Sequence, residues 1–67
     1  MNLQIGQRVI VDAAVTGDGV HHHGAIEDIY DFAGASFIEV HFDEPTQWGV
    51  WGTTVTNPEL LRKEDAA

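Results

Sequence analysis

The sequence predicts an all-β domain of about five short antiparallel strands. Short β-rich runs recur along the 67 residues, and glycine or proline separates each run from the next. In the clearest run, apolar and polar residues alternate, which is the period of a half-buried strand. The chain has no cysteine and is too short for two domains, so one packed core must hold it together.

The first strand is expected within Gly6–Asp12, where alternate valines share one side, Val9 and Val11. In the second run, Gly24–Tyr30, the isoleucines Ile26 and Ile29 are three residues apart. That spacing also suits a helix, but seven residues between glycine-bearing loops are too few for one. A strand with a β-bulge would bring both isoleucines to the core.

The third run, Ser36–Asp43, alternates most clearly, and its expected inward residues are Ile38, Val40 and Phe42. The segment Asp31–Ala35 is expected to join it to the second run as a hairpin. Pro45 cannot donate a hydrogen bond to a neighbouring strand, so it should end the ladder.

The fourth run, Gln47–Val55, is read as a strand in which Val50 faces inward, as Ile38 does. Phe37 and Trp51 then have the opposite parity, so one or both of them are expected to face outward. In Thr56–Leu61, an asparagine suited to an N-cap precedes a proline suited to the first helical position. This predicts a 3₁₀ turn in which Leu60 plugs one end of the core, followed by a short last strand.

The order of these segments resembles the SH3-like barrel superfamily, which includes KOW and Tudor-type domains. The resemblance is carried by Gly6–Val11 ("GQRVIV"), Gly24–Ile29 ("GAIEDI"), Phe37–Asp43 ("FIEVHFD") and Val55–Glu64 ("VTNPELLRKE"). It implies a small SH3-like barrel over residues 1–63, with a 3₁₀ turn before the last strand, and a short flexible tail at 64–67.

Two further proteins are similar in outline: the small stromal subunit of photosystem I and the plasmid-encoded trimethoprim-resistant dihydrofolate reductase. The reductase uses a Val-Gln-Ile-Tyr strand, but the comparable positions here, 50–53, read Val-Trp-Gly-Thr. Its catalytic motif is therefore absent, and no residue role is carried over from it.

The charge is strongly negative, because eleven acidic residues oppose three basic ones for a net charge of −8. Such a field repels phosphate backbones and anionic lipid surfaces, so neither direct nucleic-acid binding nor membrane binding is expected. A basic protein would be attracted. The first residues lack the features of a signal peptide, and no apolar run approaches membrane-spanning length, which favours a cytoplasmic location.

Aromatic and acidic residues together suggest a surface for a basic protein or peptide. Rings can contact a cation through their faces, and carboxylates can pair with it. We expect aromatic contacts from two tryptophans and steering by nearby carboxylates. The candidate binding residues are Tyr30, Phe37, Glu39, Asp43, Glu44, Trp48 and Trp51. The competing interpretation places most of these rings in the core, at the ends of the barrel or in a subunit interface.

Two other functions stay open: a homo-oligomer with a small-molecule or catalytic site at its interface, and an acidic inhibitor from a mobile element that mimics nucleic acid. The chain has no phosphate-binding loop and no evident catalytic triad, so an enzyme is not favoured. Its neighbouring carboxylates, Asp28 with Asp31 and Asp43 with Glu44, are interpreted as solvated surface groups.

The internal tract "GDGVHHHG", residues 17–24, raises the question of a metal site. Alternate residues of an extended segment share a side, so His21 and His23 could chelate while His22 could not. Asp18 or His41 could complete such a set. However, structural zinc sites usually combine ligands from separated pairs. The tract is therefore interpreted as a polar loop between the first two strands, and neither a metal nor a cofactor is expected.

Overall fold

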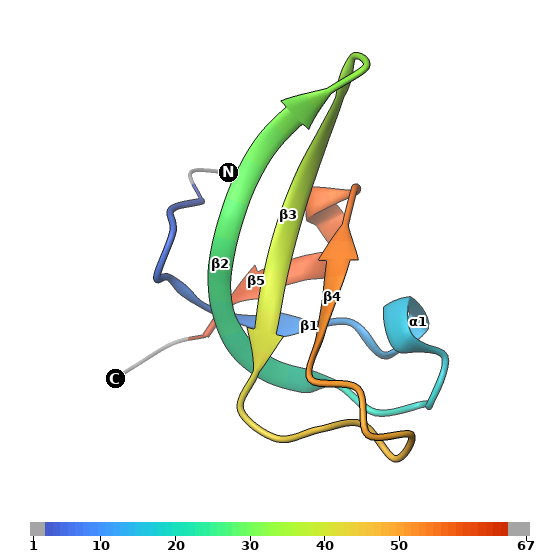
Figure 1. Cartoon of the computed structure of the whole chain (residues 1–67). Helices are drawn as coiled ribbons and strands as arrows, with labels where there is room; N and C mark the ends of the chain where they lie inside the picture. Colours follow the sequence, from blue (N-terminus) through green and yellow to red (C-terminus); the bar gives the residue numbers. More distant parts are fainter. Residues whose placement is uncertain (1–2, 65–67) are drawn as a thin grey trace.

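The computed structural model describes residues 3–64. Its elements are β1 (Arg8–Val11), α1 (Ala13–Thr16), β2 (His22–Phe32), β3 (Ala35–Phe42), β4 (Gly52–Val55), the 3₁₀ helix η1 (Pro58–Leu60) and β5 (Leu61–Lys63). The strands form one antiparallel sheet in the order β4-β3-β2-β1-β5 (Figure 1). The prediction of an all-β domain with a 3₁₀ turn before the last strand is confirmed.

β2 is the long, curved strand that joins the two halves of the sheet (Figure 1). It pairs with β1 near its start and with β3 along most of its length. The register shifts between Ile26, which faces Val40, and Asp28, which faces Glu39. Ile26 is buried and Ile29 packs partly against the core. The bulge predicted from the spacing of the two isoleucines is confirmed.

The core lies on one side of this curved sheet, and every strand contributes to it. Its buried members are Val9, Val11, Ile26, Ile38, Val40, Phe42, Val55 and Leu61. The alternation predicted for the first and third strands is therefore correct. Leu60 of η1, which was predicted to plug one end of the core, packs against the core with part of its surface. Asn57 caps η1, because its side chain accepts a hydrogen bond from the backbone N of Glu59 at 3.0 Å.

The β2–β3 hairpin projects beyond the rest of the sheet (Figure 1). Its turn residues Ala33 and Gly34 both have positive φ, 53° and 81°. This is the backbone of a type I′ turn, whose twist suits a two-residue hairpin. Because the tip extends past the core, residues 31–36 are exposed on both faces of the hairpin.

The β3–β4 connection differs from the prediction, because β4 begins at Gly52 and residues 43–51 form a loop. The buried Thr46 organises this loop: its Oγ1 accepts hydrogen bonds from the backbone N of Trp48 at 3.3 Å and of Val50 at 3.1 Å. Val50 is 47% exposed. Its expected inward position is wrong because strand alternation does not apply within this turn.

The short helix α1 was not predicted. Asp12 caps it, and the Asp12 carboxylate accepts a hydrogen bond from the backbone N of Ala14 at 2.9 Å. Within residues 3–64, neither helical segment combines the length and apolar character that a membrane crossing requires. Of the tail expected at 64–67, residues 65–67 lie outside the described part, while the backbone N of Glu64 donates to the carbonyl of Arg8 at 3.1 Å.

Gly24 of β2 lies where the backbones of β2 and β3 approach each other closely. A Cβ at this position would clash with the main-chain carbonyl of His41 on β3. Gly24→Ala should therefore cost about 3 kcal/mol, the upper end for overpacking, which is most of what a domain this small can lose. Urea unfolding of the variant and the wild type measures this loss of stability.

Gly19→Ala is the control, because a Cβ there meets nothing within 4 Å although φ is +75°. It should cost about 1 kcal/mol through backbone strain alone. Equal unfolding midpoints for the two variants would contradict the close approach of β2 and β3 at Gly24.

Candidate functional site

The bulge in β2 decides which side chains lie on the side of the sheet away from the core. Beyond it, Asp28 lies opposite Glu39 and Tyr30 lies opposite Phe37, while Ala25 lies opposite His41 before it. The inward residues of β3 alternate with these, so the pairs share the outer side. We use the name outer face for six side chains on this side of β2, β3 and the residue before β4: Asp28, Tyr30, Phe37, Glu39, His41 and Trp51, which stacks on His41.

One end of the outer face, toward the hairpin tip, is aromatic. The rings of Tyr30 and Phe37 stack with their centroids 5.4 Å apart and an angle of 17° between their planes. Tyr30 is 41% exposed and Phe37 is half-buried. Phe32, the next outward residue of β2, is exposed as well. This stacked pair therefore leaves ring surface exposed.

The opposite end of the outer face carries a second stacked pair. The rings of His41 and Trp51 lie 6.0 Å apart at an interplanar angle of 14°. The residues that flank His41 on the neighbouring strands are Ala25 and Gly52, so no large side chain competes for that space. Trp51 remains 50% exposed.

Two carboxylates, Asp28 and Glu39, lie between the aromatic pairs and face each other directly across β2 and β3. Like charges in this position repel and destabilise a sheet. One Asp28 oxygen accepts a hydrogen bond from the backbone N of Ile29 at 2.9 Å. Within residues 3–64, neither carboxylate is in an ion pair. The centre of the outer face is thus negative and unneutralised.

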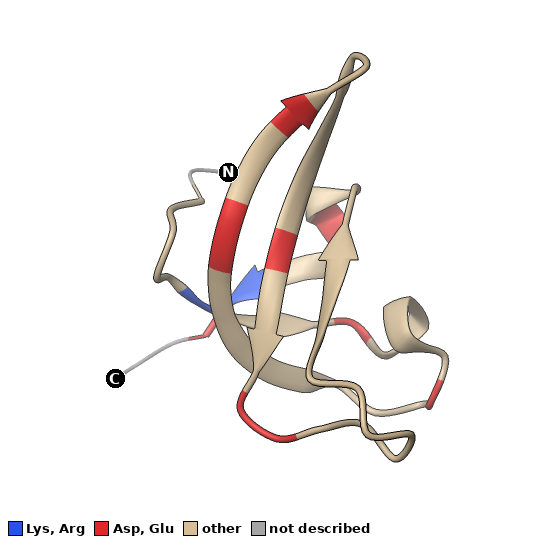
Figure 2. Cartoon of the chain, in the orientation of Figure 1, with Lys and Arg blue, Asp and Glu red and all other residues tan. Residues whose placement is uncertain are grey.

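The basic residues lie elsewhere in the sheet. Arg8 is on β1, and Arg62 and Lys63 are on β5, whereas acidic positions mark the middle of β2 and β3 (Figure 2). These are the chain's only lysines and arginines, so none of the six outer-face residues is one of them. Within residues 3–64, no lysine or arginine pairs with Asp28 or Glu39.

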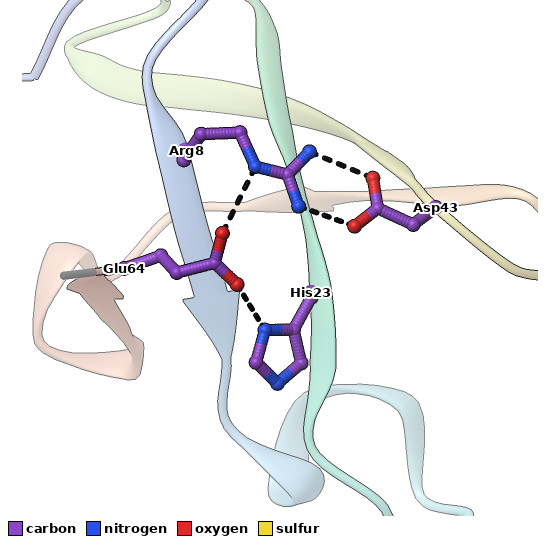
Figure 3. A network of polar contacts seen from close by, with 4 residues as sticks. All are labelled: Arg8, His23, Asp43 and Glu64. Atoms are coloured by element: carbon purple, nitrogen blue, oxygen red, sulfur yellow. Dashed lines mark hydrogen bonds and ion pairs between the residues drawn. The ribbon is translucent and has the colours of Figure 1, made fainter. Parts of the chain in front are cut away.

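Arg8 instead joins three parts of the chain (Figure 3). Its Nη1 donates to Asp43 Oδ1 at 2.7 Å, and its Nη2 donates to the other oxygen of the same carboxylate. Its Nε donates to Glu64 Oε1 at 3.0 Å, while Glu64 Oε2 contacts Nδ1 of His23. The bonds from Arg8 lower the pKa of Asp43, and the contacts with His23 and Arg8 lower the pKa of Glu64.

The seven predicted binding residues therefore separate into two groups. Four of them lie on the outer face: Tyr30, Phe37, Glu39 and Trp51. The other three lie in the β3–β4 loop: Asp43, Glu44 and Trp48. Asp43 is paired with Arg8, Glu44 is exposed, and Trp48 is 61% exposed within the turn that Thr46 organises. The two tryptophans thus occupy different surroundings.

The expectation that the histidine tract lies in a loop is wrong for His22 and His23, which begin β2, and His22 turns toward the core. The ring of His22 stacks on the buried Phe42 with centroids 4.7 Å apart, and its Nε2 lies 2.7 Å from Asp18 Oδ2. Asp18 also accepts hydrogen bonds from the Thr16 hydroxyl at 2.6 Å and the backbone N of Val20 at 3.1 Å. These contacts fasten the β1–β2 loop to the core.

The residues that the sequence suggested as metal ligands lie apart and make other contacts. Asp18 is engaged by His22, His23 contacts Glu64, and His41 lies on the outer face, while His21 is exposed. A cleft of about 470 Å³ separates the β1–β2 and β3–β4 loops, and His21, His23 and Glu44 are among its lining residues. Within the described residues, no three histidine, aspartate or glutamate side chains gather as a metal ion would require.

Sequence reasoning missed three features of this surface: the opposed carboxylates, the His41–Trp51 stack and the Arg8 network. The first two depend on strand register, which no local motif encodes. The sequence did indicate that His22 differs from its neighbours, because in an extended segment its side chain points to the opposite side from those of His21 and His23. Comparison with family models, curated proteins and solved structures found no match. The interpretation of the outer face therefore rests on its geometry and charge.

The lowered pKa of Asp18 predicts how the stability of the protein depends on pH. The hydroxyl of Thr16, followed by His22 and the backbone N of Val20, lowers the pKa of Asp18 from 3.8 to about 2. The folded state therefore binds the proton less readily than the unfolded state does. The stabilisation from Asp18 is complete above its unfolded pKa and is lost as the pH falls from about 4 toward 2.

The measurement is urea unfolding of the wild type and of Asp18→Asn at pH values from 2 to 6, where the carboxamide keeps an acceptor oxygen but cannot ionise. Asp43 and Glu64 also have lowered pKa values, so both proteins should lose stability in acid. The difference in unfolding free energy between the wild type and Asp18→Asn should become smaller as the pH approaches 2. A difference that stays constant across this range would show that the Asp18 contacts do not depend on its charge.

Proposed function

We propose that this protein is a small, non-enzymatic, cytoplasmic binding module of the SH3-like type, and that its outer face holds a basic segment of another protein. The observation that carries the proposal is the pair of opposed carboxylates. Asp28 and Glu39 face each other across β2 and β3, have no ion-pair partner within residues 3–64, and lie between two stacked aromatic pairs.

A lysine or arginine side chain fits this arrangement chemically. Its charge would pair with both carboxylates and relieve their repulsion. Its aliphatic stem would cover apolar ring surface, and a ring face attracts a cation by about 0.5–1 kcal/mol at an exposed site. No single contact of this kind is strong, so several must act together for a stable complex.

Two further properties support the same proposal. The net charge of −8 draws basic partners from a distance and disfavours phosphate backbones. The strand order β4-β3-β2-β1-β5, with η1 between β4 and β5, agrees with the arrangement that the resemblance to SH3-like barrels implies. In the adjacent loop, Glu44 and Trp48 are exposed and would extend the contact with a longer partner.

The test is a titration of the protein with a hexalysine peptide, followed by the fluorescence of its tryptophans. Glu39→Gln removes one charge from the outer face, and its effect should match an exposed ion pair of up to about 1 kcal/mol, or about threefold to fivefold weaker binding. Raising the salt concentration should weaken wild-type binding as well, because exposed charges are screened.

Glu59→Gln is the matched control, because it removes one exposed carboxylate from η1, away from the outer face. It should leave the affinity unchanged. Equal losses in the two variants would mean that hexalysine responds only to net charge, and would contradict a specific site at Asp28 and Glu39.

A further inference from the structure

The outer face presents its groups at a regular interval along β3. Alternate residues of a strand are separated by about 7 Å, so Phe37, Glu39 and His41 cover about 14 Å from first to last. Each of the three is paired on the same side: Phe37 with Tyr30, Glu39 with Asp28, and His41 with Trp51. The order along the strand is aromatic, acidic, aromatic.

We infer that the partner is an extended segment with one lysine or arginine between two apolar residues, in the alternating pattern apolar-x-basic-x-apolar. This inference rests on the proposed function and specifies its ligand. An extended chain has the same repeat as β3, so its residues i, i+2 and i+4 align with the three groups in turn. The central residue pairs with Asp28 and Glu39, and its neighbours contact the aromatic pairs.

A helical segment matches this interval less well. Residues on one helix face at i, i+4 and i+7 cover about 10.5 Å, since a helix rises only 1.5 Å per residue. The three groups on β3 extend over about 14 Å. With its basic residue at the carboxylates, a helix would place the two flanking residues about 6 and 4.5 Å away along its axis, short of the aromatic pairs at about 7 Å.

Charge further restricts the segment. The two carboxylates are confined to the centre of the outer face, and both ends are formed by stacked rings with no paired acidic group. A second basic residue at i or i+4 would therefore contribute less binding free energy than an apolar residue would. The intervening x residues point away from the sheet and are free to vary. Because the order aromatic, acidic, aromatic is the same from either end of β3, the partner segment can run in either direction.

Three synthetic peptides test the inference with the full chain. The first, GSFSKSLSG, has the alternating pattern; the second, GSFKSSLSG, has the same composition with the lysine moved by one position; the third, GSFSQSLSG, replaces lysine with glutamine. The alternating peptide should bind the wild type at least about fivefold more tightly than either of the others, which corresponds to about 1 kcal/mol. With Glu39→Gln this advantage should largely disappear, and with Glu59→Gln it should persist.

The outcomes separate the two levels of the proposal. If both lysine peptides bind equally well and both lose affinity with Glu39→Gln, the outer face binds basic segments but the alternating pattern is wrong. If a peptide with helical spacing, GSFSSSKSSLSG, binds more tightly than GSFSKSLSG, the extended segment is also wrong. If neither lysine peptide binds better than the glutamine peptide, and hexalysine binding does not depend on Glu39, the proposed function fails as well.

Discussion

The β-bulge in β2 is the constraint on which both sides of the sheet depend. Alternation along an unbroken strand would place Asp28 and Tyr30 on the same side as the buried Ile26. The register shift between Ile26 and Asp28 reverses this parity, so that Ile29 packs toward the core and Tyr30 lies outward. One extra residue thus keeps a carboxylate out of the core and places an aromatic ring on the outer face.

The same shift sets Asp28 opposite Glu39, an arrangement that costs free energy in the isolated protein. Within residues 3–64, no cation pairs with either carboxylate to offset this cost. Arg8 is committed to Asp43 and Glu64, where it joins β1 to the β3–β4 loop and to the residue after β5. Arg8 therefore joins three parts of the fold, while Asp28 and Glu39 stay without an ion pair within residues 3–64.

Much of the fold could be predicted because its signals are local. The alternation of Ile38, Val40 and Phe42 and the three-residue spacing of the isoleucines each follow from strand geometry. The prediction for Val50 was wrong because Gly49, with φ at +78°, turns the chain where a continuous strand was expected. The candidate site was less predictable, since the Arg8 contacts join residues 35 and 56 positions apart in the chain. Opposed carboxylates appear only once the bulge and the hairpin turn fix the register.

The most direct test of this account is a double-mutant cycle on the opposed carboxylates, measured by urea unfolding at low salt. Asp28→Asn and Glu39→Gln should each stabilise the free protein by up to about 1 kcal/mol, because each removes the repulsion across the strands. The double variant should gain little beyond either single variant, which corresponds to a repulsive coupling. If both substitutions destabilise the protein and the coupling is zero or attractive, the outer face does not hold unneutralised charge, and the account is wrong.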